Sequence, residues 1–319
     1  MRISYDRVLV TGGAGFIGSH TVDALLGLGV STWVLDDLSS GNIQNLSQWK
    51  HDSRMHFVRG TVRNFRKVRT LSKKVDAIIH LAAQISPYVS MSRPEITNAT
   101  NVDGTLSVLR AAVEEEIQKV VFASSSSVYG EVQSRRVSEN SLTNPITPYG
   151  VSKLAAEKYC GAFFRAYKLP TISLRYFNVY GERQSSNPYS GVIAIFARAL
   201  LEGHRPTIFG DGYQTRDFIH VSDVARANVT ALQSTVGLGQ AFNVGTGKPT
   251  TVRQLFQLLC KVTRRNAIRP VFRKAREGDI RKSCADMTRT RSVLHDAPHL
   301  DLKAGLSRLI RSLSPVRMD

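Results

Sequence analysis

The chain has 319 residues, with 43 lysines and arginines against 25 aspartates and glutamates, and therefore a formal net charge of +18. Its apolar content of 42 % is that of a globular protein with a sizeable core, and no run of about 18 uncharged apolar residues occurs, so we expect no membrane partner. The opening stretch, MRISYDRVLVTGG, enters a strand pattern at once without a signal peptide, which predicts a cytoplasmic protein.

The surplus of positive charge is compatible with nucleic acid, an anionic surface or phosphate-bearing ligands. It is densest at 63–69, at 261–276 and in the C-terminal tail, but no aromatic stacking residues alternate with it, so we expect a solvated basic surface and no nucleic-acid partner. Three cysteines, Cys160, Cys260 and Cys284, lie far apart and lack metal-ligand spacing. They predict idle buried thiols, with neither a disulfide nor a metal site.

Strands and helices alternate through the first half of the chain. A buried strand, a glycine turn and an amphipathic helix occupy 7–29, and a second strand pattern follows at 31–41. Helical patterns at 101–116 and 151–167 separate further short apolar strands, which are HFVRG, DAIIHLAA, VVFASSSSVYG and TISLRYFNVYG. This alternation predicts an α/β fold with a doubly wound parallel sheet of the Rossmann type.

The second half of the chain is less regular. A helix is predicted at 191–203, and short strands are predicted at PTIFG, RDFIHV and AFNVG. We expect a smaller α/β substrate-binding lobe that closes over the carboxyl edge of the sheet, where ligands of such folds bind. The expected division is a Rossmann-type domain of 1–175 with 215–247, and a smaller lobe of 176–214 with 248–319.

The segment VTGGAGFIGSH carries glycines at 12, 13, 15 and 18, between the first strand and the first helix. Small residues there let the backbone approach a pyrophosphate, and the helix N-terminus offers free N–H groups and a positive dipole end. Asp36 and Asp37 end the next strand, about 20 residues downstream, where an acidic side chain can bind the adenosine ribose hydroxyls. A carboxylate there repels a 2′-phosphate, so the sequence predicts NAD rather than NADP.

Tyr149 and Lys153 lie four residues apart, directly after a proline, in the pattern PYGVSK. On a helix this spacing places both side chains on one face, about one turn apart. A phenol is a poor base at neutral pH, but a nearby ammonium favours the phenolate and lowers its pKa. The pair therefore suits a tyrosinate that takes a proton from a sugar hydroxyl while hydride leaves the same carbon.

Several motifs follow one another along the chain: TGGAGFIGSH, HLAAQ, FASSSSVYG, PYGVSK and LRYFNVYG. In this order they resemble the extended short-chain dehydrogenase/reductase family, specifically its NAD-dependent nucleotide-sugar epimerase and dehydratase branch. The resemblance runs from about residue 7 to about residue 310, because GDGYQTRDFIHVSDVA and REGDIRKSCAD match later motifs of that branch. It implies that the Rossmann-type domain binds NAD and that the smaller lobe binds a nucleotide sugar.

The resemblance also assigns roles residue by residue. Tyr149 would be the catalytic acid–base group, Lys153 its partner, and Ser125 the hydroxyl that hydrogen-bonds the reacting oxygen. The implied cofactor-binding residues are Gly12, Gly15, Phe16, Ile17, Gly18, Asp36, Asp37, Leu81, Ala82, Ala83, Asn101, Tyr149, Lys153 and Phe177. The implied substrate-binding residues are Ser125, Ser126, Tyr149, Asn178, Val192, Phe209, Arg216, Arg276, Asp279 and Ser283. The arginines of this set suit a diphosphate, because a guanidinium pairs with phosphate in a bidentate fork.

The chain departs from the family pattern in places. Thr61 stands where the family usually has an acidic residue that contacts the adenine, and Pro87 and Tyr88 are unusual residues that could reshape the sugar pocket. His80 and His220 lie in strand-like motifs, and we interpret both as structural histidines rather than ligands or catalysts.

The reaction is predicted from the residues before VYG. The 4,6-dehydratases of this branch resemble one another in an acidic pair there, whereas this chain has Ser126 and Ser127. Without that pair, β-elimination lacks its general acid and base. The prediction is therefore a UDP-hexose 4-epimerase that works through a transient 4-keto sugar. A UDP-glucuronate 4-epimerase or decarboxylase stays open as the alternative because of the basic charge. Another enzyme of the same family that modifies a nucleoside diphosphate sugar also stays open, and a non-catalytic nucleotide binder is a third interpretation.

The resemblance bears on the sugar and on assembly as well. Ser283 occupies the position that borders the C2 substituent of the sugar in related epimerases, and its small side chain leaves volume for an N-acetyl group. UDP-GlcNAc and UDP-GalNAc are therefore expected as substrates as well as, or in preference to, UDP-Glc and UDP-Gal. A homodimer is implied too, through the helices at 101–116 and 151–167.

Overall fold

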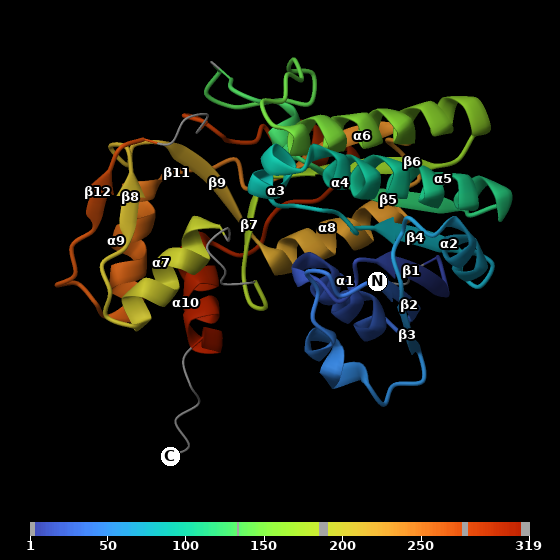
Figure 1. Cartoon of the computed structure of the whole chain (residues 1–319), viewed down its shortest axis with the longest axis horizontal. Helices are drawn as coiled ribbons and strands as arrows, with labels where there is room; N and C mark the ends of the chain where they lie inside the picture. The colour runs from blue at the N-terminus through green and yellow to red at the C-terminus, as the bar shows by residue number, and fades with distance from the viewer. Residues whose placement is uncertain (1–3, 133, 185–190, 276–279, 314–319) are drawn as a thin grey trace.

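A seven-stranded parallel sheet forms the centre of the larger lobe, on the right of Figure 1. The structure is a computed structural model that describes residues 4–132, 134–184, 191–275 and 280–313. From edge to edge the strands are β10 (Gln240–Val244), β6 (Thr171–Tyr176), β5 (Lys119–Ser125), β4 (Ala77–His80), β1 (Arg7–Thr11), β2 (Ser31–Asp36) and β3 (Met55–Arg59). The chain order reverses between β1 and β4, which is the switch point of a doubly wound sheet, so the predicted Rossmann-type architecture is confirmed.

Helices cover both faces of this sheet (Figure 1). One face carries α1 (Phe16–Gly27) and α8 (Val221–Gln233), and the other carries α2 (Phe65–Ser72), α5 (Gly104–Glu114) and α6 (Pro148–Tyr167). Short helical segments in the connections are η1 (Ile43–Trp49), α3 (Pro87–Ser92), α4 (Pro94–Asn98), η2 (Ala99–Asp103), η3 (Ser126–Val128) and η4 (Thr290–Leu294).

Strand β1 illustrates how the two faces are built from one sequence. Val8 and Val10 belong to the apolar core under α1 and α8, whereas Leu9 between them belongs to the core under α2, α5 and α6. Successive side chains of a strand point to opposite faces, so a strand that is covered on both faces must be apolar at every position. The uninterrupted apolar runs in the sequence are therefore the central strands.

In the smaller lobe, on the left of Figure 1, the described residues form two short sheets and three α-helices. One sheet contains β11 (Pro249–Thr251), β9 (Thr215–His220) and β7 (Asn178–Tyr180), and the other contains β12 (Val271–Arg273) and β8 (Thr207–Phe209). Their apolar core lies against α7 (Val192–Leu201), α9 (Val252–Thr263) and α10 (Leu302–Leu313). The predicted helix at 191–203 and the three predicted short strands are confirmed.

The segment 215–247 serves both lobes. Its first strand, β9, pairs with β7 and β11 of the smaller lobe, whereas α8 and β10 join the large sheet and its covering layer. The chain therefore passes between the lobes at the junction of β9 and α8, next to the carboxyl edge of the sheet.

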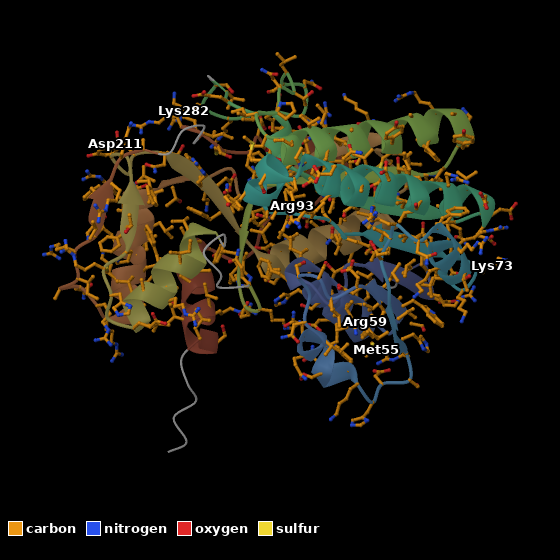
Figure 2. All side chains as sticks on the ribbon, in the orientation of Figure 1. Met55, Arg59, Lys73, Arg93, Asp211 and Lys282 are labelled. Carbon is orange, nitrogen blue, oxygen red and sulfur yellow. The ribbon has the colours of Figure 1, made fainter. Side chains whose placement is uncertain are left out.

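Charged side chains surround both lobes on the outside (Figure 2). Arg59 and Lys73 project from the larger lobe, and Asp211 and Lys282 from the smaller one. Arg93 lies at the junction of α3 and α4. No helix among the described residues is long and apolar enough to cross a membrane.

The two histidines that were predicted to be structural are buried. His80 lies between the hydroxyls of Thr11 and Thr105, at 2.6 and 3.0 Å, and burial lowers its pKa to about 3. His220 caps α8, where its Nδ1 accepts a hydrogen bond from the backbone N–H of Ser222. The three cysteines are free and buried, as predicted, and they are Cys160, Cys260 and Cys284.

A buried ion pair holds α6 on the sheet. The Arg175 guanidinium on β6 donates to both carboxylate oxygens of Glu157 on α6, at 2.9 and 2.6 Å. Ser124 donates to the same carboxylate at 2.6 Å, and Arg175 also donates to the Tyr129 hydroxyl at 2.8 Å. Both charged side chains are at most 6 % exposed, so the attraction between them must offset the loss of water around each charge.

Removal of one partner should therefore be costly. Arg175→Ala leaves the Glu157 carboxylate buried without its counter-charge, and we expect a loss of about 3–5 kcal/mol in unfolding free energy. Arg198→Ala is the control, because it breaks an exposed i,i+4 pair with Glu202 and should cost at most about 0.5 kcal/mol. Urea unfolding monitored by circular dichroism measures both, and equal losses would contradict this account of α6.

Candidate active site

The glycine turn after β1 brings the backbone close to the N-terminus of α1. A Cβ atom at Gly18 would overlap the carbonyl oxygen of Gly12, so only glycine allows this packing. The N-cap of α1 is Gly15, and no side chain caps the helix there. The first N–H groups of α1 are consequently available to an anion such as a pyrophosphate.

Asp36 anchors this turn from the end of β2. Its carboxylate accepts hydrogen bonds from the backbone N–H groups of Ala14 at 2.9 Å and Leu38 at 2.8 Å. Burial raises its pKa, and these backbone hydrogen bonds act in the opposite direction. Each carboxylate oxygen has a second lone pair, so Asp36 can hold the loop and still accept from a ribose hydroxyl.

A cavity of about 920 Å³ lies over the turn at the carboxyl edge of the sheet. Most of the residues that were predicted to bind the cofactor line it, and these are Gly12, Gly15, Phe16, Ile17, Gly18, Asp36, Asp37, Leu81, Ala82, Ala83, Tyr149 and Lys153. Thr61, which departs from the family pattern, lines it too. The bare backbone at Gly18, the uncapped helix and the acidic end of β2 together fit a dinucleotide.

Asn101 and Phe177 were also predicted to bind the cofactor, but they are not among the residues that line this cavity. Asn101 is buried, and it accepts from the Gln84 N–H at 2.7 Å and donates to the Ser152 hydroxyl at 2.9 Å. It therefore ties the segment after β4 to α6. Phe177 borders a second cavity, described below, rather than the first.

Tyr176 was not predicted, although it lines both cavities. It ends β6, and its hydroxyl donates to Asn228 Oδ1 of α8 at 2.5 Å, which fixes the ring across the sheet edge. The sequence showed only that Tyr176 lies within a predicted strand, and the pairing of this strand with β5 comes from the structure.

Tyr149 and Lys153 lie in the first turns of α6, as their spacing predicted. Thr147 caps this helix, with its hydroxyl accepting from the Gly150 N–H at 3.2 Å, and Pro148 is its first residue. Lys153 is 3 % exposed, and its Nζ donates to the Ala123 carbonyl at 2.8 Å. Burial lowers the pKa of Lys153 to about 7.

The pKa of Tyr149 differs from the expectation of a lowered value. Burial raises it above 10, and a side-chain hydrogen bond with Ser125 is the influence that lowers it. The physical reason is that the Tyr149 phenol loses water, which penalises the phenolate, while Lys153 is itself desolvated and hydrogen-bonded to Ala123. The raised pKa makes Tyr149 a neutral phenol beside Ser125.

A second cavity, of about 700 Å³, adjoins the Ser125 end of β5. Both lobes contribute to it, and the lining residues are Ser125, Ser126, Ser127, Tyr129, Gly130, Val132, Val137, Tyr176, Phe177, Asn178, Arg216, Ile280, Lys282 and Ser283. A third cavity, of about 620 Å³, shares Asn178 and Arg216 with it and is also lined by Val192 and Phe209. Most of the predicted substrate residues lie along these two adjoining cavities, whereas Tyr149 lines the first cavity. Arg276 and Asp279 lie outside the described residues.

Arg216 stands where these two cavities meet. Its Nη1 donates to the backbone carbonyls of Thr215 at 2.9 Å and Ile280 at 2.6 Å. These bonds hold a cation at the boundary, which is a suitable place for a diphosphate that links a sugar to a nucleoside.

Asp217, which was also not predicted, positions this edge of the site. Its fully buried carboxylate accepts from the backbone N–H groups of Thr246, Gly247 and Ala285, at 2.8, 2.8 and 3.0 Å. It thereby joins β9 to the loop after β10 and to the segment that carries Ser283. Within the described ranges, no cluster of three or more His, Cys, Asp and Glu side chains could hold a metal ion.

Comparison with known proteins supports this geometry. Residues 8–245 match the NAD dependent epimerase/dehydratase family. A putative UDP-glucose 4-epimerase of Methanocaldococcus jannaschii is 40 % identical over 307 residues, covering 95 % of this chain and 97 % of that protein.

Two solved structures are similar over nearly the whole chain. The UDP-glucose 4-epimerase of Thermotoga maritima, with UDP-glucose, has a TM-score of 0.91 at 38 % identity, covering 96 % of this chain and 98 % of that one. The UDP-N-acetylglucosamine 4-epimerase of Methanobrevibacter ruminantium M1, in complex with UDP-N-acetylmuramic acid, has a TM-score of 0.93 at 35 % identity, covering 98 % and 99 %. The resemblance drawn from the sequence motifs is confirmed.

The glycine turn offers a matched pair of substitutions. Gly18→Ala places a methyl group on the Gly12 carbonyl, so we expect NAD affinity to fall at least about 100-fold through displacement of the α1 N-terminus. Gly27→Ala, in the same helix, meets nothing within 4 Å and should leave NAD affinity unchanged. Calorimetric titration with NAD measures both, and unaltered binding by a folded Gly18→Ala variant would contradict the assignment.

Proposed function

This chain belongs to the NAD dependent epimerase/dehydratase family and is an NAD-dependent nucleotide-sugar epimerase, and we propose that it interconverts the C4 epimers of a UDP-hexose through a transient 4-keto sugar. The observation that supports this most directly is the meeting of Tyr149 and Ser125 where the dinucleotide cavity adjoins the second cavity.

The residues of the first cavity would hold the cofactor. The glycine turn and the α1 N-terminus suit its pyrophosphate, Asp36 and Asp37 its adenosine ribose, and Lys153 its nicotinamide ribose. NAD⁺, when bound, supplies the chemistry of accepting a hydride from C4 and returning it to the 4-keto sugar.

Side chains of the protein carry out the proton transfer at the C4 oxygen of the sugar. Tyr149 takes the hydroxyl proton in the forward direction and gives it back in reverse, and Ser125 donates a hydrogen bond to the same oxygen. The pKa of Tyr149 is raised by burial, so ionisation needs nearby positive charge, and Lys153 lines the same cavity.

The second cavity favours epimerisation over dehydration. Among the described residues that line it, none carries a carboxylate, and Ser126 and Ser127 occupy the turn after β5. Removal of the C5 proton and expulsion of the C6 hydroxyl would each need a proton-transfer group there.

The choice of sugar depends on Ser283 in this proposal. Ser283 lines the second cavity, and its backbone N–H donates to the Thr215 carbonyl at 3.2 Å. Its small side chain leaves room for an N-acetyl group at C2, so UDP-GlcNAc and UDP-GalNAc are proposed substrates alongside UDP-Glc and UDP-Gal.

A UDP-uronate is the second candidate. The described charged residues that line the second cavity, Arg216 and Lys282, are both cations, and a C6 carboxylate would be attracted to them. 4-Epimerisation or decarboxylation of UDP-glucuronate is therefore the alternative reaction.

We also propose a homodimer that pairs through α5 and α6. Between these helices lies a surface hollow lined by Leu106, Arg110, Val113, Phe163 and Tyr167, and the Tyr167 side chain is 59 % exposed. Aromatic residues and arginine are enriched in such interfaces.

The cytoplasmic location stays a prediction from the sequence.

The acid–base assignment is tested with Tyr149→Phe. With NAD supplied, proton NMR should show the wild-type protein converting a UDP-gluco sugar to its galacto epimer, and the variant should be about 10²–10⁴-fold slower because the transferred proton has lost its acceptor. Tyr159→Phe is the control, because Tyr159 lies on the same helix, is 40 % exposed and should be dispensable. If the wild type turns over neither UDP-GlcNAc nor UDP-Glc, the proposed UDP-hexose epimerisation is wrong and UDP-glucuronate becomes the favoured substrate.

The sugar assignment is tested with Ser283→Tyr. We expect turnover of UDP-GlcNAc to fall at least about 10-fold more than turnover of UDP-Glc, because the larger ring fills the space for the N-acetyl group. Ser283→Ala, which keeps that space, should retain both substrates. Equal losses on the two sugars in Ser283→Tyr would contradict the assignment.

A further inference from the structure

The turn after β5 contains a hydrogen-bond arrangement that the reaction described above does not by itself require. Ser125 ends β5 and caps η3, with its side-chain oxygen accepting from the backbone N–H of Ser127 at 3.2 Å. The Ser127 hydroxyl donates to the same Ser125 oxygen at 2.9 Å. Two groups of one residue therefore converge on Ser125 Oγ.

These two bonds determine what Ser125 can still do. A serine hydroxyl has two acceptor lone pairs and one proton to donate. Both lone pairs of Ser125 Oγ are engaged by Ser127, so its remaining capacity is to donate. Tyr149, the other partner of Ser125, gains stabilisation of its phenolate from that bond, which is the effect of a donor on an anionic acceptor.

A close backbone contact keeps the turn and Tyr149 in register. Gly150, directly after Tyr149 in α6, lies so close to the turn that a Cβ atom at this position would be 2.8 Å from the Ser127 carbonyl oxygen. The same atom would be 2.8 Å from the Pro145 side chain. The Ser127 backbone is thus packed on the first turn of the helix that carries the catalytic phenol.

We propose that Ser127 is a positioning residue that makes the Ser125 hydroxyl a one-way hydrogen-bond donor, directed toward the Tyr149 oxygen before the sugar binds and toward the sugar C4 oxygen during the reaction. This inference rests on the proposed epimerisation and deepens it. As the C4 hydride leaves for NAD⁺, Tyr149 Oη takes the C4 hydroxyl proton. Ser125 keeps its own proton and donates to the oxygen that becomes the carbonyl. In the return step the same proton passes back from Tyr149.

Ser127 also lines the second cavity, so a direct contact with the sugar is the competing role. The two roles differ in their dependence on Ser125. A residue that acts through Ser125 has no effect once Ser125 is gone, whereas a sugar contact acts whether or not Ser125 is present.

A double-mutant cycle separates the two roles. We expect Ser127→Ala to lower kcat about tenfold with KM changed less than twofold, because the loss of one hydrogen bond affects the reaction step rather than binding. Ser127→Thr keeps the donor oxygen and should restore kcat to within about threefold of the wild type. Ser125→Ala/Ser127→Ala should be no slower than Ser125→Ala. A further loss of about tenfold in the double variant, or a change confined to KM, would overturn the proposal.

A second measurement does not depend on turnover. In protein labelled with ¹³C at the tyrosine ζ carbon, with NAD present, the Tyr149 resonance is assigned by its loss in Tyr149→Phe and followed against pH. We expect Ser127→Ala to raise the titration midpoint of Tyr149 and Ser127→Thr to leave it in place. Lys153, Asp36 and Asp37, the charged residues that line the cavity with Tyr149, are kept in each variant.

The titration also separates this proposal from the proposed reaction. If no UDP-hexose is turned over but the midpoint moves in Ser127→Ala alone, the reaction assignment fails and the role of Ser127 stands. An unmoved midpoint in a Ser127→Ala variant that folds with the wild-type melting temperature would overturn the role of Ser127, whichever sugar is the substrate.

Discussion

The buried ion pair between Glu157 of α6 and Arg175 of β6 determines where the reactive groups of this protein lie. It holds α6 across the carboxyl ends of β5 and β6, and through Ser124 it also reaches β5. A pair that is almost fully desolvated stabilises only one geometry, because a displaced partner would leave a charge in the apolar interior. Tyr149, Lys153 and Ser125 consequently meet in the same place although α6 and β5 are separated in the sequence.

Two cavities lie at the carboxyl edge of the sheet, and the second one is lined by residues of both lobes. The switch point between β1 and β4 leaves space for a dinucleotide, and the smaller lobe contributes Asn178, Arg216 and Ser283 to the second cavity, which is the proposed place of the nucleotide sugar. Asp217 ties β9 to the loops of both lobes by four hydrogen bonds. A buried carboxylate needs such donors to offset the loss of water, so these bonds stabilise the connection between β9 and the two loops.

The serine turn after β5 bears both on the kind of reaction and on the proton transfer at Tyr149. Ser126 and Ser127 leave the second cavity without a carboxylate among its described lining, which favours the proposed epimerisation over dehydration. Ser127 also donates two hydrogen bonds to Ser125 Oγ, one from its backbone N–H and one from its hydroxyl. Burial raises the pKa of Tyr149, and the hydrogen bond from Ser125 acts in the opposite direction.

Local patterns in the sequence determined the central strands, the glycine turn, Asp36 and the helical spacing of Tyr149 and Lys153, because each depends on neighbours within a few residues or on strand periodicity. Tertiary structure decided the rest. Tyr176 and Asp217 contact partners on α8 and in distant loops, Asn101 is buried between the segment after β4 and α6, and Phe177 lines the second cavity. The direction of the Tyr149 pKa shift also depends on burial, which is the sum of contacts from distant segments and has no signature in a short stretch of sequence.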